Sequence, residues 1–223
     1  MPSIFRQAHF QPIVELASGK IFAYEALSRD AEGRADIVDF FGRFESSGLL
    51  RPLKELCFRK QLTCASALGV TRVFLNTDFE LLGGLYGKIK RPAGMDVVLE
   101  ISERERVENI EERLKMAEAW RKDGFQFACD DVGAGFLSFP FFIRLRPEFI
   151  KFDLSVVHQA MASPHLQAFL REATRLLLGV SRGLIAEGIE TPAQLSLIKG
   201  LGIPLGQGFL LGRPQRHPIR EGS

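Results

Sequence analysis

The sequence is poor in the residues that mark disulfide-stabilised or membrane-spanning proteins. Cysteine occurs only three times among 223 residues, as Cys57, Cys64 and Cys129, without CxxC spacing. This odd count argues against a disulfide framework or a cysteine-bound metal, and it suits a reducing compartment. No run approaches the roughly 18 apolar residues of a membrane span, and the N-terminus lacks the apolar segment of a signal peptide. We therefore expect no membrane span and a cytoplasmic location.

Net charge is also small. The 29 Lys and Arg residues exceed the 27 Asp and Glu residues by only two. This balance argues against binding to a nucleic-acid polymer, which usually requires a basic excess. Hydrophobic residues make up 46% of the chain, including 19 Phe, which argues against disorder. No linker-like segment divides the chain, so we expect one domain over residues 1–223, with a core at about 8–214 and a frayed tail at 215–223.

Short runs rich in β-branched and aromatic residues alternate with helical patterns. Strands are predicted at 8–16, 20–27, 72–76, 96–101, 125–130, 148–153, 183–187 and 203–207. Helices are predicted near 36–47, 50–68, 104–123, 165–181 and 192–200. Ser18 and Gly19 predict a hairpin between the first two strands, which are then antiparallel. The alternation predicts an α/β fold, with a closed (β/α) barrel favoured over an open doubly wound sheet.

Seven of the predicted strands carry a polar or ionisable residue near their C-terminal end. These residues are Glu25, Asn76, Glu100, Asp130, Lys151, Glu187 and Gln207. Parallel strands of a barrel bring these ends to one face, where barrel active sites lie. Within 125–130, side-chain alternation separates Phe125, Phe127 and Cys129 from the polar Asp130. The apolar set can pack on outer helices, so Asp130 is expected to point inward.

Carboxylates that converge in this way need protons or cations to neutralise them. A single acidic residue at a strand end is usually a helix cap or a solvated charge, but a set in phase on successive strands favours a metal site. Its oxygen ligands suit Mg²⁺ or Mn²⁺ rather than zinc. Adjacent Asp130 and Asp131 suit a pair of ions, and such pairs typically promote attack of water on a phosphodiester. Lys151 would orient that water or balance phosphate charge.

The same residues lie in an ordered series of motifs that resembles the EAL domain family, the cyclic di-GMP-specific phosphodiesterases. The motifs are QPI at 11–13, EALSR at 25–29, LNT at 75–77, LEISE at 99–103, DDVGAG at 130–135, IKFD at 150–153, AEGIET at 186–191 and QGFLLGRP at 207–214. The tripeptide Glu25-Ala26-Leu27 alone is a weak signal, whereas the whole series of motifs is specific for the family. The resemblance implies a TIM-type barrel with one antiparallel strand, and hydrolysis of cyclic di-GMP to linear pGpG with two Mg²⁺ or Mn²⁺ ions.

The resemblance also implies a role for individual residues. The implied metal ligands are Glu25, Asn76, Glu100, Asp130, Asp131 and Glu187. The implied catalytic residues are Glu25, Asp130, Asp131, Lys151 and Glu187, with Lys151 contacting the attacking water. Substrate-binding roles fall on Gln11, Leu27, Arg29, Asp153 and Gln207. Among these, Leu27 and Arg29 would hold the phosphate and sugar region, and Gln11 a guanine edge. Glu103 would brace the loop after Asp130, and Glu190 would support the site.

The loop after the paired aspartates departs from the family pattern. The usual DDFGTGYSS is replaced by DDVGAGFLS, with Val132 for Phe and Ala134 for Thr. The resemblance implies that this region joins the metal site to a homodimer interface, and the Phe-rich segment 136–143 belongs either to that interface or to the core. The departures remove none of the implied ligands. They leave an alternative open, in which the chain is a weak or inactive EAL domain that acts as a cyclic di-GMP receptor or protein-interaction module.

Overall fold

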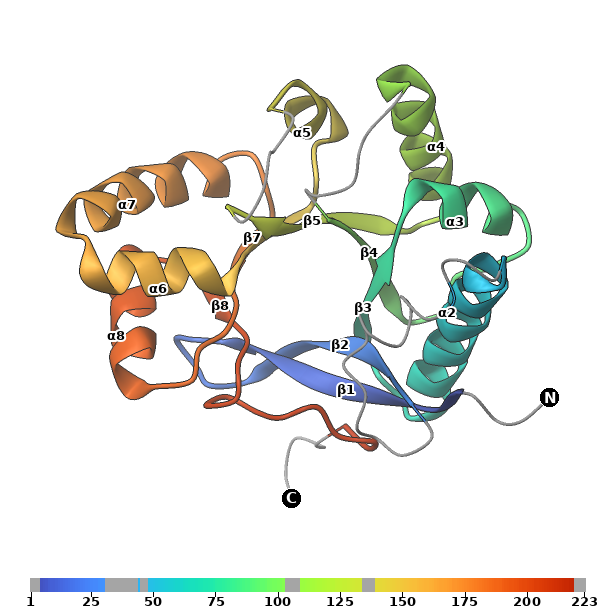
Figure 1. The fold of residues 1–223 in the computed structure, drawn as a ribbon, viewed down its shortest axis with the longest axis horizontal. Helices are drawn as coiled ribbons and strands as arrows, with labels where there is room; N and C mark the ends of the chain where they lie inside the picture. The colour runs from blue at the N-terminus through green and yellow to red at the C-terminus, as the bar shows by residue number, and fades with distance from the viewer. Residues whose placement is uncertain (1–4, 31–43, 45–47, 103–108, 134–138, 219–223) are drawn as a thin grey trace.

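A computed structural model describes residues 5–30, 44, 48–102, 109–133 and 139–218. Eight strands close into one barrel in chain order (Figure 1). They are β1 (Phe5–Glu15), β2 (Ile21–Asp30), β3 (Arg72–Thr77), β4 (Asp96–Ser102), β5 (Gln126–Val132), β6 (Phe149–Phe152), β7 (Gly183–Ala186) and β8 (Leu205–Gly206). This closure confirms the predicted barrel and excludes the open doubly wound sheet.

Strand β1 is the antiparallel member of the barrel. It runs antiparallel to both β2 and β8, whereas the other neighbouring pairs are parallel. The predicted hairpin joins β1 to β2, with Gly19 at φ +74° and its N–H donating to the Glu15 carbonyl at 2.8 Å. A positive φ of this size favours glycine. The antiparallel register places Gln11 directly opposite Glu25, at the same end of the barrel as the C-termini of the parallel strands.

The described helices lie around the outside of the barrel (Figure 1). They are α2 (Leu50–Ala67), α3 (Phe79–Leu85), α4 (Ile110–Lys122), α5 (Phe139–Leu145), α6 (Leu154–Ala162), α7 (Pro164–Leu178) and α8 (Pro192–Leu201). Sequence periodicity missed α3, α5 and α6, because helices of seven to nine residues hold too few turns for a repeat to be recognised. The predicted helix at 36–47 lies outside the described residues except at Phe44, and the one at 104–123 is described only from residue 109 onward.

The chain after β8 returns along β1 (Figure 1). Gln215 exchanges both backbone hydrogen bonds with Phe10, at 2.7 and 3.0 Å. Gln215, the first residue of the predicted tail, is therefore paired with β1. Among the described helices, none has the length and apolar character needed to cross a membrane.

Alternation along the strands separates two apolar clusters. The outer cluster lies between strands and helices and includes Phe127, Ile150 and Trp120. The inner cluster, here called the apolar floor, comprises Ile13, Ala23, Phe74, Val98, Ala128, Phe149, Ile185 and Leu205. Strand side chains of like parity share a face. On β2 to β8, the residue two positions after each floor residue is therefore inward as well, one level higher in the barrel.

An ion pair on the outside of the barrel ties α4 to the start of β6. Arg121 Nε lies 3.0 Å from Glu148 Oε1, and both side chains are 17% exposed. Glu148 Oε2 accepts a hydrogen bond of 2.7 Å from the Phe127 backbone N–H in β5. The Arg121 guanidinium also donates to the Leu145 carbonyl at 2.7 Å. Glu148 thus satisfies a strand N–H and a largely buried guanidinium at once.

We expect Glu148→Ala to lower the free energy of unfolding by about 2–3 kcal/mol, because it removes the side-chain acceptor of the Phe127 N–H and a largely buried anionic partner of Arg121. Urea unfolding followed by circular dichroism measures the change. Glu172→Ala is the control, since Glu172 pairs with Arg175 on the exposed surface, where such pairs contribute at most about 1 kcal/mol. Equal losses in the two variants would contradict the assignment.

Candidate active site

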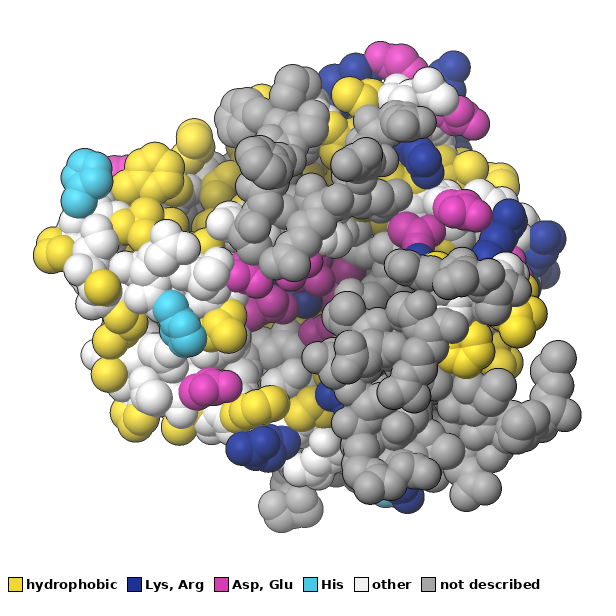
Figure 2. Space-filling model, in the orientation of Figure 1, with side chains coloured by type: hydrophobic (Ala, Val, Ile, Leu, Met, Phe, Trp, Pro, Cys, Tyr) yellow, Lys and Arg dark blue, Asp and Glu magenta, His cyan; other side chains and the backbone are white. Residues whose placement is uncertain are grey.

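Polar side chains form the layer directly above the apolar floor. This polar layer comprises Glu25, Asn76, Glu100, Asp130, Lys151, Glu187 and Gln207, each two residues after a floor residue. Gln11 of the antiparallel β1 joins it, two residues before Ile13. Figure 2 shows acidic side chains gathered in a hollow at the centre of this face of the barrel. A cavity of ≈ 370 Å³ opens there, lined among others by Glu25, Asp130, Lys151, Glu187 and Gln207.

The ammonium of Lys151 lies at the centre of the layer and is 1% exposed. Its Nζ is 2.6 Å from Glu187 Oε1, 2.7 Å from Glu100 Oε1, 3.1 Å from Asp130 Oδ1 and 3.4 Å from Glu25 Oε2. The four carboxylates come from β2, β4, β5 and the residue after β7, so the barrel itself brings them around one cation. Among the described residues, one positive charge therefore serves four acidic groups, of which Glu25, Glu100 and Asp130 are buried.

This shortage of positive charge is visible in the pKa values. Burial alone would lower the pKa of Lys151, but the charges of Asp130, Glu100, Glu187 and Glu25 raise it well above its ordinary value. Burial raises the pKa of Glu100 well above its ordinary value and that of Glu187 to about 8, and the charge of Lys151 offsets this only in part. Burial likewise raises the pKa of Asp130. Lys151 thus stays charged, while its acidic neighbours are incompletely neutralised.

Glu25 is the best-satisfied carboxylate of the layer. Its Oε1 accepts a hydrogen bond of 2.7 Å from Asn76 Nδ2, and its Oε2 accepts one of 2.6 Å from Gln207 Nε2. Burial would raise the pKa of Glu25, but the Lys151 charge and these hydrogen bonds lower it overall. Gln207 Nε2 also lies 3.2 Å from Gln11 Oε1, and Gln11 Nε2 donates to the Gly212 carbonyl at 3.2 Å. Both oxygens of Glu25 are therefore held in place.

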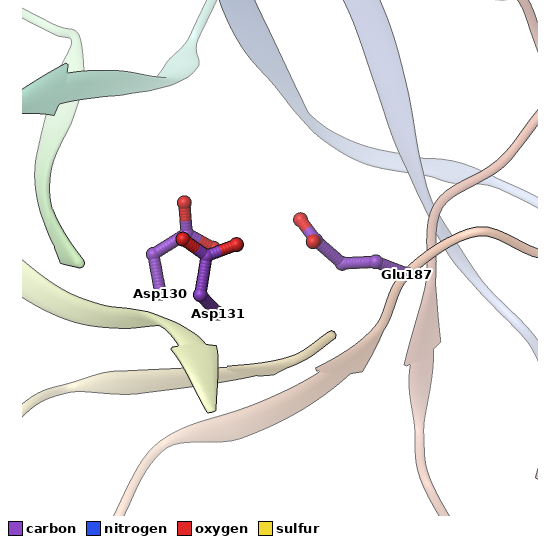
Figure 3. A group of neighbouring side chains, drawn as sticks. All are labelled: Asp130, Asp131 and Glu187. Atoms are coloured by element: carbon purple, nitrogen blue, oxygen red, sulfur yellow. The ribbon is translucent and has the colours of Figure 1, made fainter. Parts of the chain in front are cut away.

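Asp130 and Asp131 both point into the cavity, although neighbours on a regular strand face opposite sides. Asp131 has a φ of +59°, and the pairing of β5 with β6 shifts register between Cys129 and Val132. This bulge turns Asp131 inward, where Ser102 Oγ donates to its Oδ2 at 2.9 Å. Figure 3 shows the carboxylates of Asp130, Asp131 and Glu187 turned toward one another, and an oxygen from each lies within 4.8 Å of the others.

The donor set fits hard divalent cations. Four carboxylates (Glu25, Glu100, Asp130 and Glu187) contact the Lys151 ammonium, and Asp131 lies beside Asp130 and Glu187. Every available ligand atom is oxygen, as Mg²⁺ and Mn²⁺ prefer. Glu100 Oε2 is buried without a hydrogen-bond partner among the described residues. Additional positive charge is what this arrangement lacks, and divalent cations would supply it.

The predicted substrate-binding residues fall into two groups. Gln11, Leu27 and Gln207 line the cavity. Arg29 and Asp153 do not line it. The Arg29 guanidinium donates to the Ser28 carbonyl at 3.2 Å, and the Asp153 carboxylate caps α6 by accepting from the Ser155 N–H at 2.7 Å. Asp153 thus has a structural role in this geometry, and its contact with substrate stays a prediction.

The remaining predicted positions surround the site. Glu190 lines the cavity with an exposed side chain. Glu103 and Ala134 lie outside the described residues, whereas Val132 packs against the outer cluster. In segment 136–143, Phe141 and Phe142 are buried in the core, as one of the two interpretations of that segment expects.

Sequence reasoning missed Ser102, which donates a hydrogen bond to Asp131, and four residues that line the cavity. Ser102 follows Glu100 by two positions, so its inward phase could have revealed it. Leu154, Gly188, Gly208 and Phe209 line the cavity. These four lie in helix α6 and in the loops after β7 and β8, where strand alternation gives no information.

Comparison with known proteins agrees with this geometry. The model of the EAL domain family matches residues 6–214. Cyclic di-GMP phosphodiesterase NbdA of Pseudomonas aeruginosa is 29% identical over 228 residues, covering 93% of this chain and 29% of that protein. Cyclic di-GMP phosphodiesterase PA2567 of the same organism is 27% identical over 220 residues, covering 92% and 38%. The chain thus spans less than two fifths of either relative.

Solved structures share the fold. Klebsiella pneumoniae BlrP1, in a complex with calcium and cyclic di-GMP, superposes with a TM-score of 0.83 at 27% identity, covering 96% of this chain and 56% of that one. A standalone EAL protein from Vibrio cholerae O395, with cyclic di-GMP bound, gives a TM-score of 0.78 at 24% identity over 97% and 94%. The family match over 6–214, the closed barrel with antiparallel β1 and these superpositions lead to one conclusion: the chain belongs to the EAL domain family.

Proposed function

We propose that this chain hydrolyses cyclic di-GMP to linear pGpG in the cytoplasm, with two Mg²⁺ or Mn²⁺ ions. The observation that carries the proposal is the polar layer, in which Lys151 contacts four carboxylates at the open end of the barrel. The relatives NbdA and PA2567 bear the name cyclic di-GMP phosphodiesterase, which supports the proposal. The BlrP1 complexes with cyclic di-GMP and either calcium or manganese support the choice of divalent cations.

The residues proposed to hold the ions are Glu25, Asn76, Glu100, Asp130, Asp131 and Glu187. Ions bound there would act as Lewis acids on the phosphodiester and increase the acidity of water. The protein would contribute orientation and charge. Asn76 and Gln207 fix the Glu25 carboxylate. Lys151, whose pKa is raised by its acidic neighbours, would keep its proton and present its ammonium to the attacking water. Glu190, beside the cavity, would support the site.

Substrate would enter the cavity above this layer. Gln11 and Leu27 border it, and we propose that they meet a guanine edge and the sugar region. Arg29 stands two residues beyond Leu27 on β2, where its guanidinium can turn toward a phosphate. A homodimer through the region after Asp131 is also proposed, with Ile143 as an exposed apolar contributor from α5.

We expect Glu25→Gln to reduce hydrolysis of cyclic di-GMP by about 10³-fold, because it removes a charge from the metal-binding set without changing its shape. Formation of pGpG in Mn²⁺, followed by chromatography, measures the rate, and EDTA should abolish it in the wild type. Glu172→Gln is the matched control, because Glu172 is exposed on α7 and pairs with Arg175.

Two results would contradict this proposal. One is unchanged pGpG formation in Glu25→Gln or in EDTA. The other is absence of product from the wild type, and a calorimetric titration then separates the alternatives. Saturable binding of cyclic di-GMP would identify a receptor, and absence of binding would favour an interaction module.

We expect Lys151→Met to abolish hydrolysis and to lower the melting temperature in EDTA, since four carboxylates lose their shared cation. Added Mn²⁺ should then raise the melting temperature more in the variant than in the wild type, because it supplies the missing charge. Thermal unfolding with and without Mn²⁺ measures both effects. Equal Mn²⁺-induced shifts in the two proteins would show that Lys151 does not share the charge balance of the site.

A further inference from the structure

An aromatic side chain stands at the rim of the cavity, outside the polar layer. Phe209 follows β8, lines the cavity and is 47% exposed. Single exposed apolar side chains are common on protein surfaces and need no special explanation. Phe209 differs in two respects, which are the rigidity of its backbone and the group that covers part of its ring.

The backbone around Phe209 is locked to the loop after β7. A Cβ at Gly208 would lie 2.2 Å from the Ile189 carbonyl oxygen and 2.3 Å from its nitrogen, so only glycine fits this close approach. Hydrogen bonds join Ile189 N–H to the Gln207 carbonyl and Leu210 N–H to the Ile189 carbonyl, each at 3.0 Å. Both chain neighbours of Phe209 are thus held, and its place at the rim is set by the fold.

Arg213 orients the aromatic ring. Its guanidinium carbon lies 4.2 Å from the centroid of Phe209, within the range of a cation–π contact. Arg213 is not among the residues that line the cavity. The guanidinium therefore covers a part of the ring other than the part that borders the cavity, where aromatic surface remains available to a ligand.

On the basis of the proposed function, we propose that Phe209 is a stacking platform for one purine base of the substrate. Bases of unpaired nucleotides stack on aromatic side chains and on arginine planes, and this contact accepts any purine. Each phosphate of a cyclic dinucleotide is flanked by two nucleosides. A phosphate placed over the polar layer therefore brings a base close to the rim that Phe209 occupies.

Substitutions at Phe209 test the platform through the Michaelis constant. Phe209→Ala should raise KM for cyclic di-GMP by about 10-fold or more, the loss expected for one base–aromatic contact. The value of kcat should change by less than about threefold, because the polar layer is untouched. Phe209→Trp should retain the wild-type KM, whereas Phe209→Leu, which keeps apolar bulk without an aromatic face, should resemble Phe209→Ala.

Phe169→Ala is the matched control. Phe169 is a phenylalanine on α7 with 64% exposure, and it does not line the cavity. The KM of Phe169→Ala for cyclic di-GMP should therefore equal that of the wild type. Phe209→Trp adds a direct readout, because the chain has one other tryptophan, the buried Trp120. The tryptophan fluorescence of the Phe209→Trp variant should be quenched on mixing with cyclic di-GMP in Mn²⁺. No comparable change should occur in the wild type.

The outcomes separate this proposal from the proposed function. An unchanged KM in Phe209→Ala, a wild-type KM in Phe209→Leu, or a fall in kcat alone would overturn the platform while the activity stands. If the wild type forms no pGpG, calorimetric titration with cyclic di-GMP in Mn²⁺ decides instead. A Kd for cyclic di-GMP that is about 10-fold or more higher in Phe209→Ala than in the wild type supports the platform. Equal Kd values overturn it. Absence of binding by the wild type overturns both proposals.

Discussion

The contact of one buried ammonium with four carboxylates is the constraint on which this structure depends. Lys151 is excluded from water, so each nearby acidic group interacts with it more strongly than at the surface. The same exclusion leaves the acidic groups short of positive charge and raises the pKa values of Glu100, Asp130 and Glu187. A site built this way gains electrostatic strength from burial, and its incomplete neutralisation favours the binding of further cations.

The apolar floor makes that burial possible. Each floor residue on β2 to β8 lies two positions before a member of the polar layer, so the barrel interior changes from apolar to charged within one side-chain level. The floor closes the barrel beneath Lys151, and the cavity opens on the other side. Because these carboxylates are carried by hydrogen-bonded strands or by the residue that follows one, the strand register sets the distances between their backbones. The preorganisation of the site is thus a consequence of the strand register.

Much of this arrangement was predictable because it follows from strand periodicity. The inward phase of Glu100, Asp130 and Lys151, and the outward phase of Phe127 and Ile150, needed only alternation and the barrel. Asp131 was predicted as a ligand from its adjacency to Asp130 and from the family resemblance. Its inward orientation depends on a left-handed backbone and a register shift that alternation does not anticipate.

The short helices α3, α5 and α6 were missed because local sequence is a weak signal over one or two turns. Phe209 was missed because the loops after β7 and β8 have no period.

This difference between strands and loops also divides the chemistry of the site. The polar layer lies at strand ends, where register fixes the distances between charges and leaves little freedom for variation. The rim lies on loops, and there Phe209 is held by contacts between Gly208 and Ile189 rather than by a sheet ladder. A change at the rim leaves the charge balance around Lys151 intact, whereas a change in the layer disturbs every group that shares the ammonium. In the proposed function, stacking of a base on Phe209 can therefore vary independently of the groups proposed to act on the phosphodiester. The boundary between them lies at Gln207, which hydrogen-bonds to Glu25 two residues before Phe209.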